Sequence, residues 1–188
     1  MTEDAIYSGL IRYLNSVNTL AKDLGNAGAL EAIDRAYQAK PRPRGSYATV
    51  SLLSERDLEE IECDTFRDAM IGGEARGVRE KHRAHEWLFR IDIYATFATD
   101  AARTFTTALR AEEATLFMAP AVVRRVYPAI TATPMHSQQA WEGRANVDVA
   151  IGGVVSASVP TDFIEHGAVD VHSARPTGLP GFDRRQTF

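Results

Sequence analysis

Two histidines three residues apart are the first residues whose chemistry stands out. His82 and His85 lie in the run HRAHE at positions 82–86, which also contains the carboxylate of Glu86. Imidazole and carboxylate groups are common zinc ligands, but the HExxH and HxxEH motifs need a helix to bring both imidazoles to one side. This run matches neither motif and leads into a predicted strand, where a spacing of three residues points side chains to opposite faces. We therefore expect two rim histidines and no metal site.

The other histidines and the cysteine have no partners at useful spacing. His136, His166 and His172 are predicted in loops or near the C-terminal segment, so only a composite site built from distant segments stays open. Cys63 is the only cysteine, which excludes an internal disulfide and a thiolate metal cluster. The acidic residues on either side of it disfavour a negatively charged thiolate nucleophile. We expect no catalytic residue, no cofactor and no metal.

Acidic and glycine-containing stretches give weak signals for ligand binding. The run DLEEIE at positions 57–62 could bind a divalent cation, although a solvated acidic edge is the favoured interpretation. Gly72, Gly73 and Gly77 are not followed by the strand-to-helix junction that a phosphate-binding loop requires. The sequence contains no GxSxG, GxGxxG or Walker-type motif. No recognised reaction centre follows from these residues.

The composition is that of an ordinary globular protein. A chain of 188 residues with 45% hydrophobic and 24% charged residues favours one domain. The net charge of −4 argues against general nucleic-acid affinity, because phosphate contacts need clustered cations. We expect no signal peptide, and the apolar runs fall far short of the roughly 20 residues that a membrane span needs. A single cysteine fits folding in a reducing cytoplasm.

The strongest pattern runs from residue 85 to residue 110 and predicts a strand, a turn and a helix. Apolar side chains occupy alternate positions, at Trp87, Phe89, Ile91, Ile93, Ala95 and Phe97. A period of two indicates a strand with one face in a core. In the turn 98–100, Thr99 or Asp100 can cap the next helix. The apolar stripe of that helix should lie back on the strand, and its members are Ala101, Phe105, Ala108, Leu109 and Leu116.

A second alternating strand is predicted at residues 141–151, and it could pair antiparallel with the first. Both polar faces mix acidic residues with arginine, so opposite charges could face each other, each pair contributing about 0.2–1 kcal/mol. Gly152 and Gly153 permit a bulge or bend before a further strand at 154–159.

Weaker patterns predict the remaining elements. An amphipathic helix at 4–24 can be capped by Thr2 and ended by Gly25 and Asn26. Residues 33–37 fit either a short strand or a helix end. Pro128 and Pro134 confine the segment after the central helix to loop or edge strand. Further strands are expected at 47–54, 61–69 and 122–127, with a last edge piece at 163–171.

These elements predict an α+β fold with a mainly antiparallel β-sheet and two principal helices packed on one face. A long hairpin or loop arm is expected at 69–81, where glycines and mixed charges interrupt the apolar pattern. The expected boundaries are a single domain over residues 1–172 and an extended or disordered C-terminal tail over 173–188, which contains two prolines and two glycines before its last charged residues.

The assembled pattern resembles the neck or tail terminator proteins of tailed bacteriophages. The likeness covers roughly residues 5–170 and consists of element order and short phrases. These phrases are RAYQ at 35–38 followed by PRP at 41–43, YATV at 47–50, the strand-to-helix unit 81–110 and EGRANVDV at 142–149.

The resemblance implies a structural virion protein that assembles into a ring, commonly a homohexamer. Such a ring caps the tail tube, stops its growth and offers a surface to the head-tail connector or neck protein. The implied partners are the chain itself, the tail tube protein and the connector, with no membrane, and DNA only as cargo passing through the lumen. The protein would be made in the bacterial host cytoplasm and reside in the virion at the neck. No catalytic residues carry over from the family.

Segments 41–45, 69–81 and 173–188 are free to reach neighbouring subunits. Lysine occurs only at positions 22, 40 and 81, and the planar guanidinium of arginine suits interfaces, although a GC-rich coding bias explains the same excess. We predict subunit or partner contacts at Arg42, Arg44, Arg76, Arg79, Arg184 and Arg185. Two alternatives stay open: a small enzyme with a composite site at His82 or His136, and a binding module that uses an exposed sheet edge.

Overall fold

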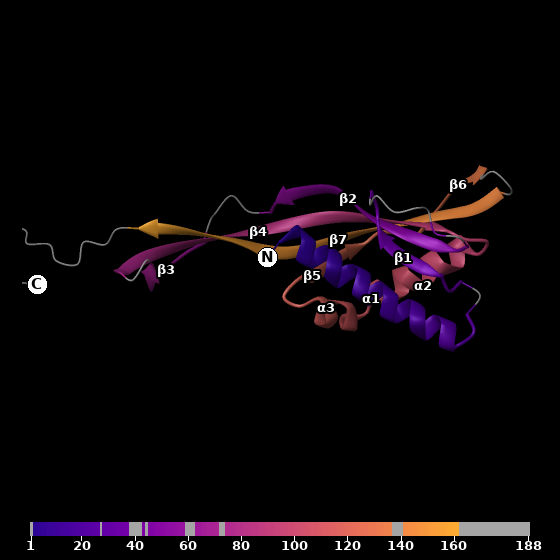
Figure 1. The fold of residues 1–188 in the computed structure, drawn as a ribbon. Helices are drawn as coiled ribbons and strands as arrows, with labels where there is room; N and C mark the ends of the chain where they lie inside the picture. Colours follow the sequence, from indigo (N-terminus) through magenta and orange to yellow (C-terminus); the bar gives the residue numbers. More distant parts are fainter. Residues whose placement is uncertain are drawn as a thin grey trace, which may run out of the picture.

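The computed structural model describes residues 2–26, 28–37, 43, 45–58, 63–71, 74–136 and 141–161. In this part of the chain, three helices accompany a seven-stranded sheet (Figure 1). The elements in chain order are α1 (Glu3–Asp23), β1 (Ala32–Arg35), β2 (Tyr47–Asp57), β3 (Cys63–Ile71), β4 (Glu74–Tyr94), α2 (Ala98–Arg110), α3 (Glu112–Met118), β5 (Val122–Val126), β6 (Ile130–His136) and β7 (Trp141–Thr161).

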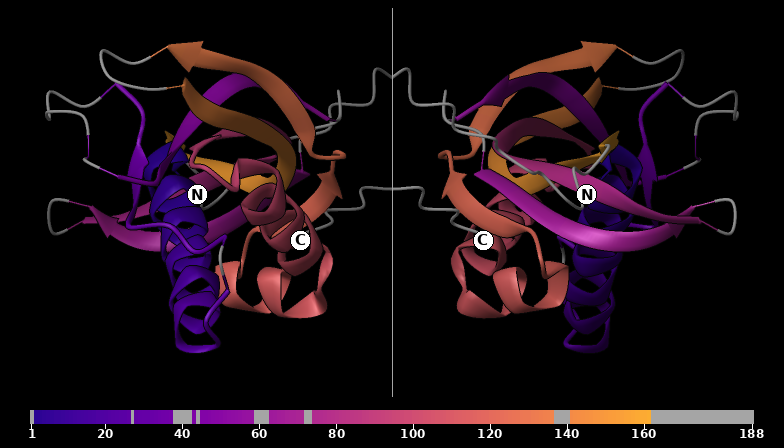
Figure 2. Two further views of the ribbon diagram at one scale, coloured as in Figure 1. Left: turned by 90° about the vertical axis from the view of Figure 1, so that its right-hand side faces the viewer. Right: turned by 90° about the vertical axis from the view of Figure 1, so that its left-hand side faces the viewer.

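The sheet is mainly antiparallel and carries its helices on one side. Its main path is β1-β2-β4-β7-β5, with β3 beside β4 and β6 beside β7. Only the pairing of β1 with β2 is parallel among the described strands. Seen along the long axis, the curved sheet lies over the three helices (Figure 2). The predicted α+β class is confirmed, with α3 as a short third helix.

β4 and β7 form the centre of this sheet. They pair antiparallel without interruption from Gly77 opposite Thr161 to Tyr94 opposite Arg144. The two strands predicted at 85–97 and 141–151 therefore pair as expected, although each is 21 residues long. The register is continuous past Gly152 and Gly153, so the bulge that these glycines permit does not form between β4 and β7. Gly152 instead gives room to Arg124, whose Cδ would lie 2.7 Å from an added Cβ, and the register shift falls in β5.

The core lies between the helix-facing side of the sheet and α1, α2 and α3. The alternating residues of β4 and β7 are fully buried there, together with the inner faces of α1 and α2. The largest of these side chains are Phe89, Phe105, Leu10, Leu14, Leu30, Ile91, Ile93, Leu109 and Ile151. The apolar period of two thus predicted the buried face of β4 correctly as far as Ile93, and Ala95 just after the strand is also buried.

α1 begins and ends as predicted. The Thr2 Oγ1 accepts a hydrogen bond of 3.3 Å from the N–H of Ala5, and Gly25 has a φ of +69° just after the helix. Asn18 is buried on this helix and bonds both backbone groups of Leu30, at 2.8 Å to its carbonyl and 2.7 Å from its N–H. This contact fixes the loop that leads into β1, so residues 33–37 begin as a strand and not as a helix end.

Three details of the segment after β4 differ from the prediction. α2 begins at Ala98, so the turn at 98–100 is the first helical turn and neither Thr99 nor Asp100 caps it. Phe97 is half exposed, because β4 has ended at Tyr94. Leu116 is 67% exposed, because extended backbone at Ala111 ends α2 and starts α3 in a new direction.

The remaining strands extend or shorten the predicted ranges. β2 reaches Asp57, β5 ends at Val126, and β6 is an edge strand whose register shifts around Pro134, as an edge proline allows. The expected loop at 69–81 is wrong in part, because β3 runs to Ile71 and β4 starts at Glu74. The pieces expected at 163–171 and 173–188 lie outside the described residues.

Phe105→Ala should destabilise the fold by about 3–5 kcal/mol, since it leaves a cavity under the sheet. Leu116→Ala, on the exposed side of α3, should change the free energy of unfolding by less than about 0.5 kcal/mol. Urea denaturation followed by circular dichroism measures both values. Equal losses for the two variants would show that α3 packs through Leu116 after all.

Candidate assembly arm

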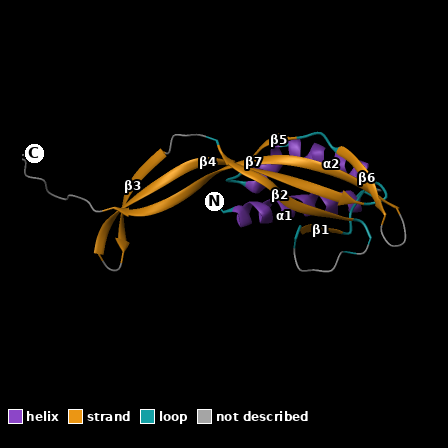
Figure 3. Cartoon of the chain, turned by 90° about the horizontal axis from the view of Figure 1, so that it is seen from above, coloured by secondary structure: helices purple, strands orange, loops and turns teal. Residues whose placement is uncertain are grey.

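A three-stranded arm extends beyond the part of the sheet that the helices cover. β3 pairs with β4 from Cys63 opposite His82 to Ile71 opposite Glu74, and β7 lines the other side of β4 as far as Thr161. We call residues 63–71, 74–83 and 154–161 the arm, and Figures 1 and 3 show it projecting away from the helices. Eight residues separate His82 from Glu74 on β4, which corresponds to about 26 Å of extended chain.

Cross-strand pairs of charged side chains hold the arm together where no helix covers it. Arg67 and Glu80 approach to 2.6 Å, and Arg79 forms an ion pair with Asp64. The guanidinium of Arg79 also lies 5.7 Å from the ring centroid of Phe66. The hydrogen bond from Arg79, followed by its charge and those of Lys81 and His82, lowers the pKa of Asp64. Exposed pairs of this kind stabilise weakly one by one, so the backbone ladder carries most of the arm's rigidity.

The two histidines lie on opposite faces of β4, as their spacing predicts. His82 lies 3.0 Å from Thr65 Oγ1 and 2.8 Å from Ser156 Oγ, so both of its ring nitrogens contact hydroxyls of neighbouring strands. His85 Nδ1 lies 2.9 Å from Asp57. The hydrogen bond with His85, and then that with Arg83, lowers the pKa of Asp57. These contacts join β2 to the root of the arm.

The described histidines and the cysteine do not lie together at one site. Among the described residues, no group of three or more His, Cys, Asp or Glu side chains is arranged to hold a metal ion. Cys63 is exposed on β3. His82 lies beside Ser156, whereas His136 pairs with Trp141 near the opposite end of β7. Fifteen residues of strand amount to roughly 50 Å, so these two histidines do not converge.

The predicted contact arginines are placed unevenly. Arg42, Arg44, Arg184 and Arg185 lie outside the described residues. Arg76 belongs to β4 opposite Ala69, and its side chain is not described. Arg79 is occupied by Asp64 and Phe66 within the arm. As contacts with another subunit or a partner, all six therefore stay predictions.

Exposed apolar side chains on the arm were missed by sequence reasoning that favoured charge. Phe66 is 59% exposed and Met70 70% exposed, on the same face of β3, and Val159 of β7 is also exposed. Apolar groups that are left in water on an extended element commonly mark a contact surface. The signal in the sequence is the alternation of Asp64, Phe66, Asp68 and Met70 at every second position of the strand.

The uncovered face of the body is polar and electrically balanced. Arg90 bonds Asp148 through two nitrogens at 2.8 and 2.9 Å, and Arg144 bonds Asp92 at 2.8 Å. These hydrogen bonds raise the pKa of both arginines. The pairs join β4 to β7, so the predicted facing of opposite charges is confirmed. No helix in the described part is long and apolar enough to cross a membrane.

The described residues form a helix-backed, mainly antiparallel sheet from which a three-stranded arm projects. The family model described as phage neck terminator protein matches residues 4–175, a range that includes nearly every element of the fold. The chain therefore belongs to the phage neck terminator protein family, and its role is that of a structural component of the phage neck or tail. No curated protein matches the chain.

Arg79→Gln should raise the pKa of Asp64 toward the usual carboxyl range, because the bond from Arg79 is the main cause of its depression. A lowered native pKa stabilises the arm above the unfolded carboxyl pKa, and this contribution disappears as the pH falls through the lowered value. Carboxyl carbon NMR titration measures the shift. Arg67→Gln, which removes the pair with Glu80, is the matched control and should leave the titration of Asp64 unaltered. Identical titrations in wild type and Arg79→Gln would contradict this assignment.

Proposed function

We propose that the chain forms a closed ring, commonly of six copies, that terminates the tail tube and joins the tail to the head connector. The membership of the neck terminator family carries this proposal. The proposal goes beyond the family membership in three points, which are the ring, its partners and its position between the tail and the head.

The arm is consistent with a ring because it extends beyond the core of its own subunit, where it can contact the next copy. A ring of identical copies needs a heterologous contact, in which one surface meets a different surface of the next copy. The arm supplies one such surface at the far end of β4, and the helix-backed body supplies the other.

The lumen of the ring should let DNA pass without gripping it. The chain carries a net charge of −4, and the arginines of the uncovered body face are matched by carboxylates of the neighbouring strand. Phosphate binding requires cations that are free to displace counterions, which paired arginines do not offer. A basic channel in the assembled ring would contradict this part of the proposal.

Native mass spectrometry of the chain, alone and mixed with the tail tube protein, tests the ring. We expect a single closed stoichiometry in the mixture, because the end of the tube templates the subunits. Subunits that stay monomeric in both samples, or intact virions that lack this chain at the neck, would overturn the proposed function.

Removing the β3–β4 hairpin of the arm should abolish the ring but keep the fold. A variant in which Gly-Ser-Gly replaces residues 65–79 retains every core side chain of β4 from Trp87 to Ile93. We expect native-like circular dichroism and cooperative unfolding, with monomers in the mixture with tube protein. Leu116→Ala, on the body, is the control and should assemble like the wild type. Full assembly of this variant would show that the ring contacts do not need the β3–β4 hairpin.

A further inference from the structure

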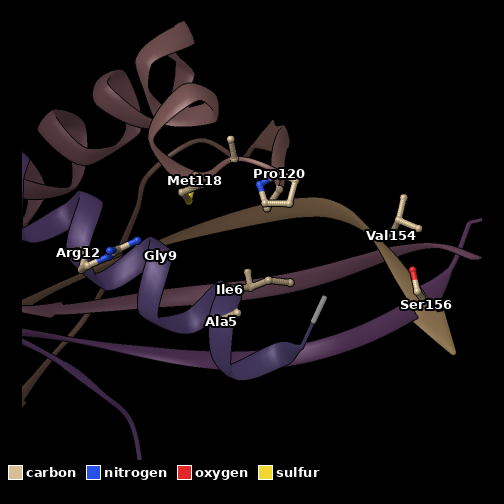
Figure 4. Close-up of a pocket in the computed structure, with 10 residues that line it drawn as sticks. Ala5, Ile6, Gly9, Arg12, Met118, Pro120, Val154 and Ser156 are labelled. Carbon is tan, nitrogen blue, oxygen red and sulfur yellow. The ribbon is translucent and has the colours of Figure 1, made fainter. Parts of the chain in front are cut away.

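An open apolar groove lies between the first half of α1, the turn after α3 and the base of the arm. Figure 4 shows Ile6, Gly9 and Arg12 of α1 facing Met118 and Pro120, with β7 passing at one end. The groove has a volume of about 560 Å³. α1 contributes Ala5, Ile6, Gly9 and Arg12 to a lining that is apolar except for Arg12 and Ser156. The guanidinium of Arg12 lies 5.8 Å from the ring centroid of Phe117.

Gly9 is a buried residue of α1 that lines the groove, and the subunit's own packing does not require a glycine there. It lies in the interior of a 21-residue helix, where glycine is destabilising relative to alanine. An added Cβ would meet nothing closer than Met118 Cγ at 3.8 Å, which is an ordinary van der Waals contact. The missing side chain therefore leaves space at the centre of the groove that the described neighbours do not fill.

The helix-side face of β3 has the complementary pattern. Phe66, Asp68 and Met70 alternate along the strand, so an exposed carboxylate stands between two exposed apolar side chains. The ring of Phe66 is already contacted by Arg79 of the same arm. Met70 is the more exposed of the two apolar residues, and its flexible thioether adapts to irregular spaces.

We propose that the groove receives Met70 from the arm of a second copy of this chain, with Asp68 of that arm paired to Arg12. Met70 and Asp68 are separated by about 6.6 Å along β3. Gly9 and Arg12 are about 4.5 Å apart along α1, and the long arginine side chain covers the difference. In this contact the side chain of Met70 packs against the apolar residues of the groove, and the carboxylate of Asp68 pairs with the guanidinium of Arg12. Both pairs form together in only one register of the arm on the groove.

The arm cannot fill the groove of its own subunit. Ser156, at the groove, is opposite His82, whereas Met70 is opposite Ala75. Seven residues of paired strand hold the two apart by about 23 Å, and a three-stranded ladder does not fold back over that distance. Met70 can therefore enter the groove only from a neighbouring copy. This inference rests on the proposed ring and identifies the contact that closes it.

Charge reversal with rescue tests the contact in the full chain. Arg12→Asp and Asp68→Arg each place like charges together, so each should raise the concentration needed for half-assembly on tube protein about tenfold. The double variant restores opposite charges and should return within about threefold of wild type. Arg103→Asp reverses an exposed arginine on α2 and is the matched control, with no expected effect on assembly.

Cysteine cross-linking locates the partner. In the background Cys63→Ser, one preparation carries Gly9→Cys and a second carries Met70→Cys. The mixture should form a disulfide between two chains, since a Cβ fits at Gly9. Pairing Met70→Cys with Leu116→Cys should give no cross-link, because Leu116 lies on the exposed side of α3.

The outcomes separate this inference from the proposed function. Closed rings that form without charge rescue and without the cross-link would overturn the groove contact and leave the ring standing. A disulfide from Gly9→Cys to Leu179→Cys within one chain would also overturn it, because the C-terminal segment would then occupy the groove. Failure of wild-type chains to form any ring with tube protein would overturn both.

Discussion

The pairing of β4 with β7 is the constraint on which the rest of the structure depends. It runs unbroken from Gly77 opposite Thr161 to Tyr94 opposite Arg144, and every other strand except β1 joins the sheet through one of these two. One half of the pair lies over the helices and carries the core, whereas the other half forms two strands of the arm. The arm is therefore not a loop added to a domain but the continuation of its central ladder, and its direction is set by the core.

The chemistry of the side chains changes along the same two backbones. Between Trp87 and Ile93, β4 buries every second residue beneath α1 and α2, so hydrophobic burial holds that half in place. From His82 toward the tip of the arm, hydrogen bonds and ion pairs across three strands replace the core. A small sheet is stable by itself only with a hydrophobic face or a helix packed on it, so the uncovered arm depends on its continuity with the body. The contacts of Asp57 with His85 and Arg83 secure that junction.

Those strands and helices could be predicted whose buried side chains recur at the spacing of a strand or of a helix. The buried faces of β4 and β7 and the inner stripe of α1 follow from apolar spacing, and the arginine–carboxylate pairs follow from the alternation between them. The extent of the arm did not follow, because polar strands have no buried face to mark them. Leu116 fitted the apolar period of the helix that begins near residue 98, but it lies on α3. The extended backbone at Ala111 that separates the two helices cannot be recognised from side-chain types. The groove was unpredictable because α1, the turn after α3 and β7 meet only in the folded chain.

The shared strands also connect the two surfaces of the proposed ring contact. Ser156 borders the groove and pairs with His82 at the base of the arm, so both surfaces rest on one rigid ladder. A neighbour seated in the groove would press on the strands that carry the next arm. Interfaces built on packed strands transmit such contacts as rigid-body shifts, because close-packed structure has low compressibility. Occupation of one groove would then orient the arm that enters the next, and the rotation between neighbouring copies decides whether the series closes into a ring.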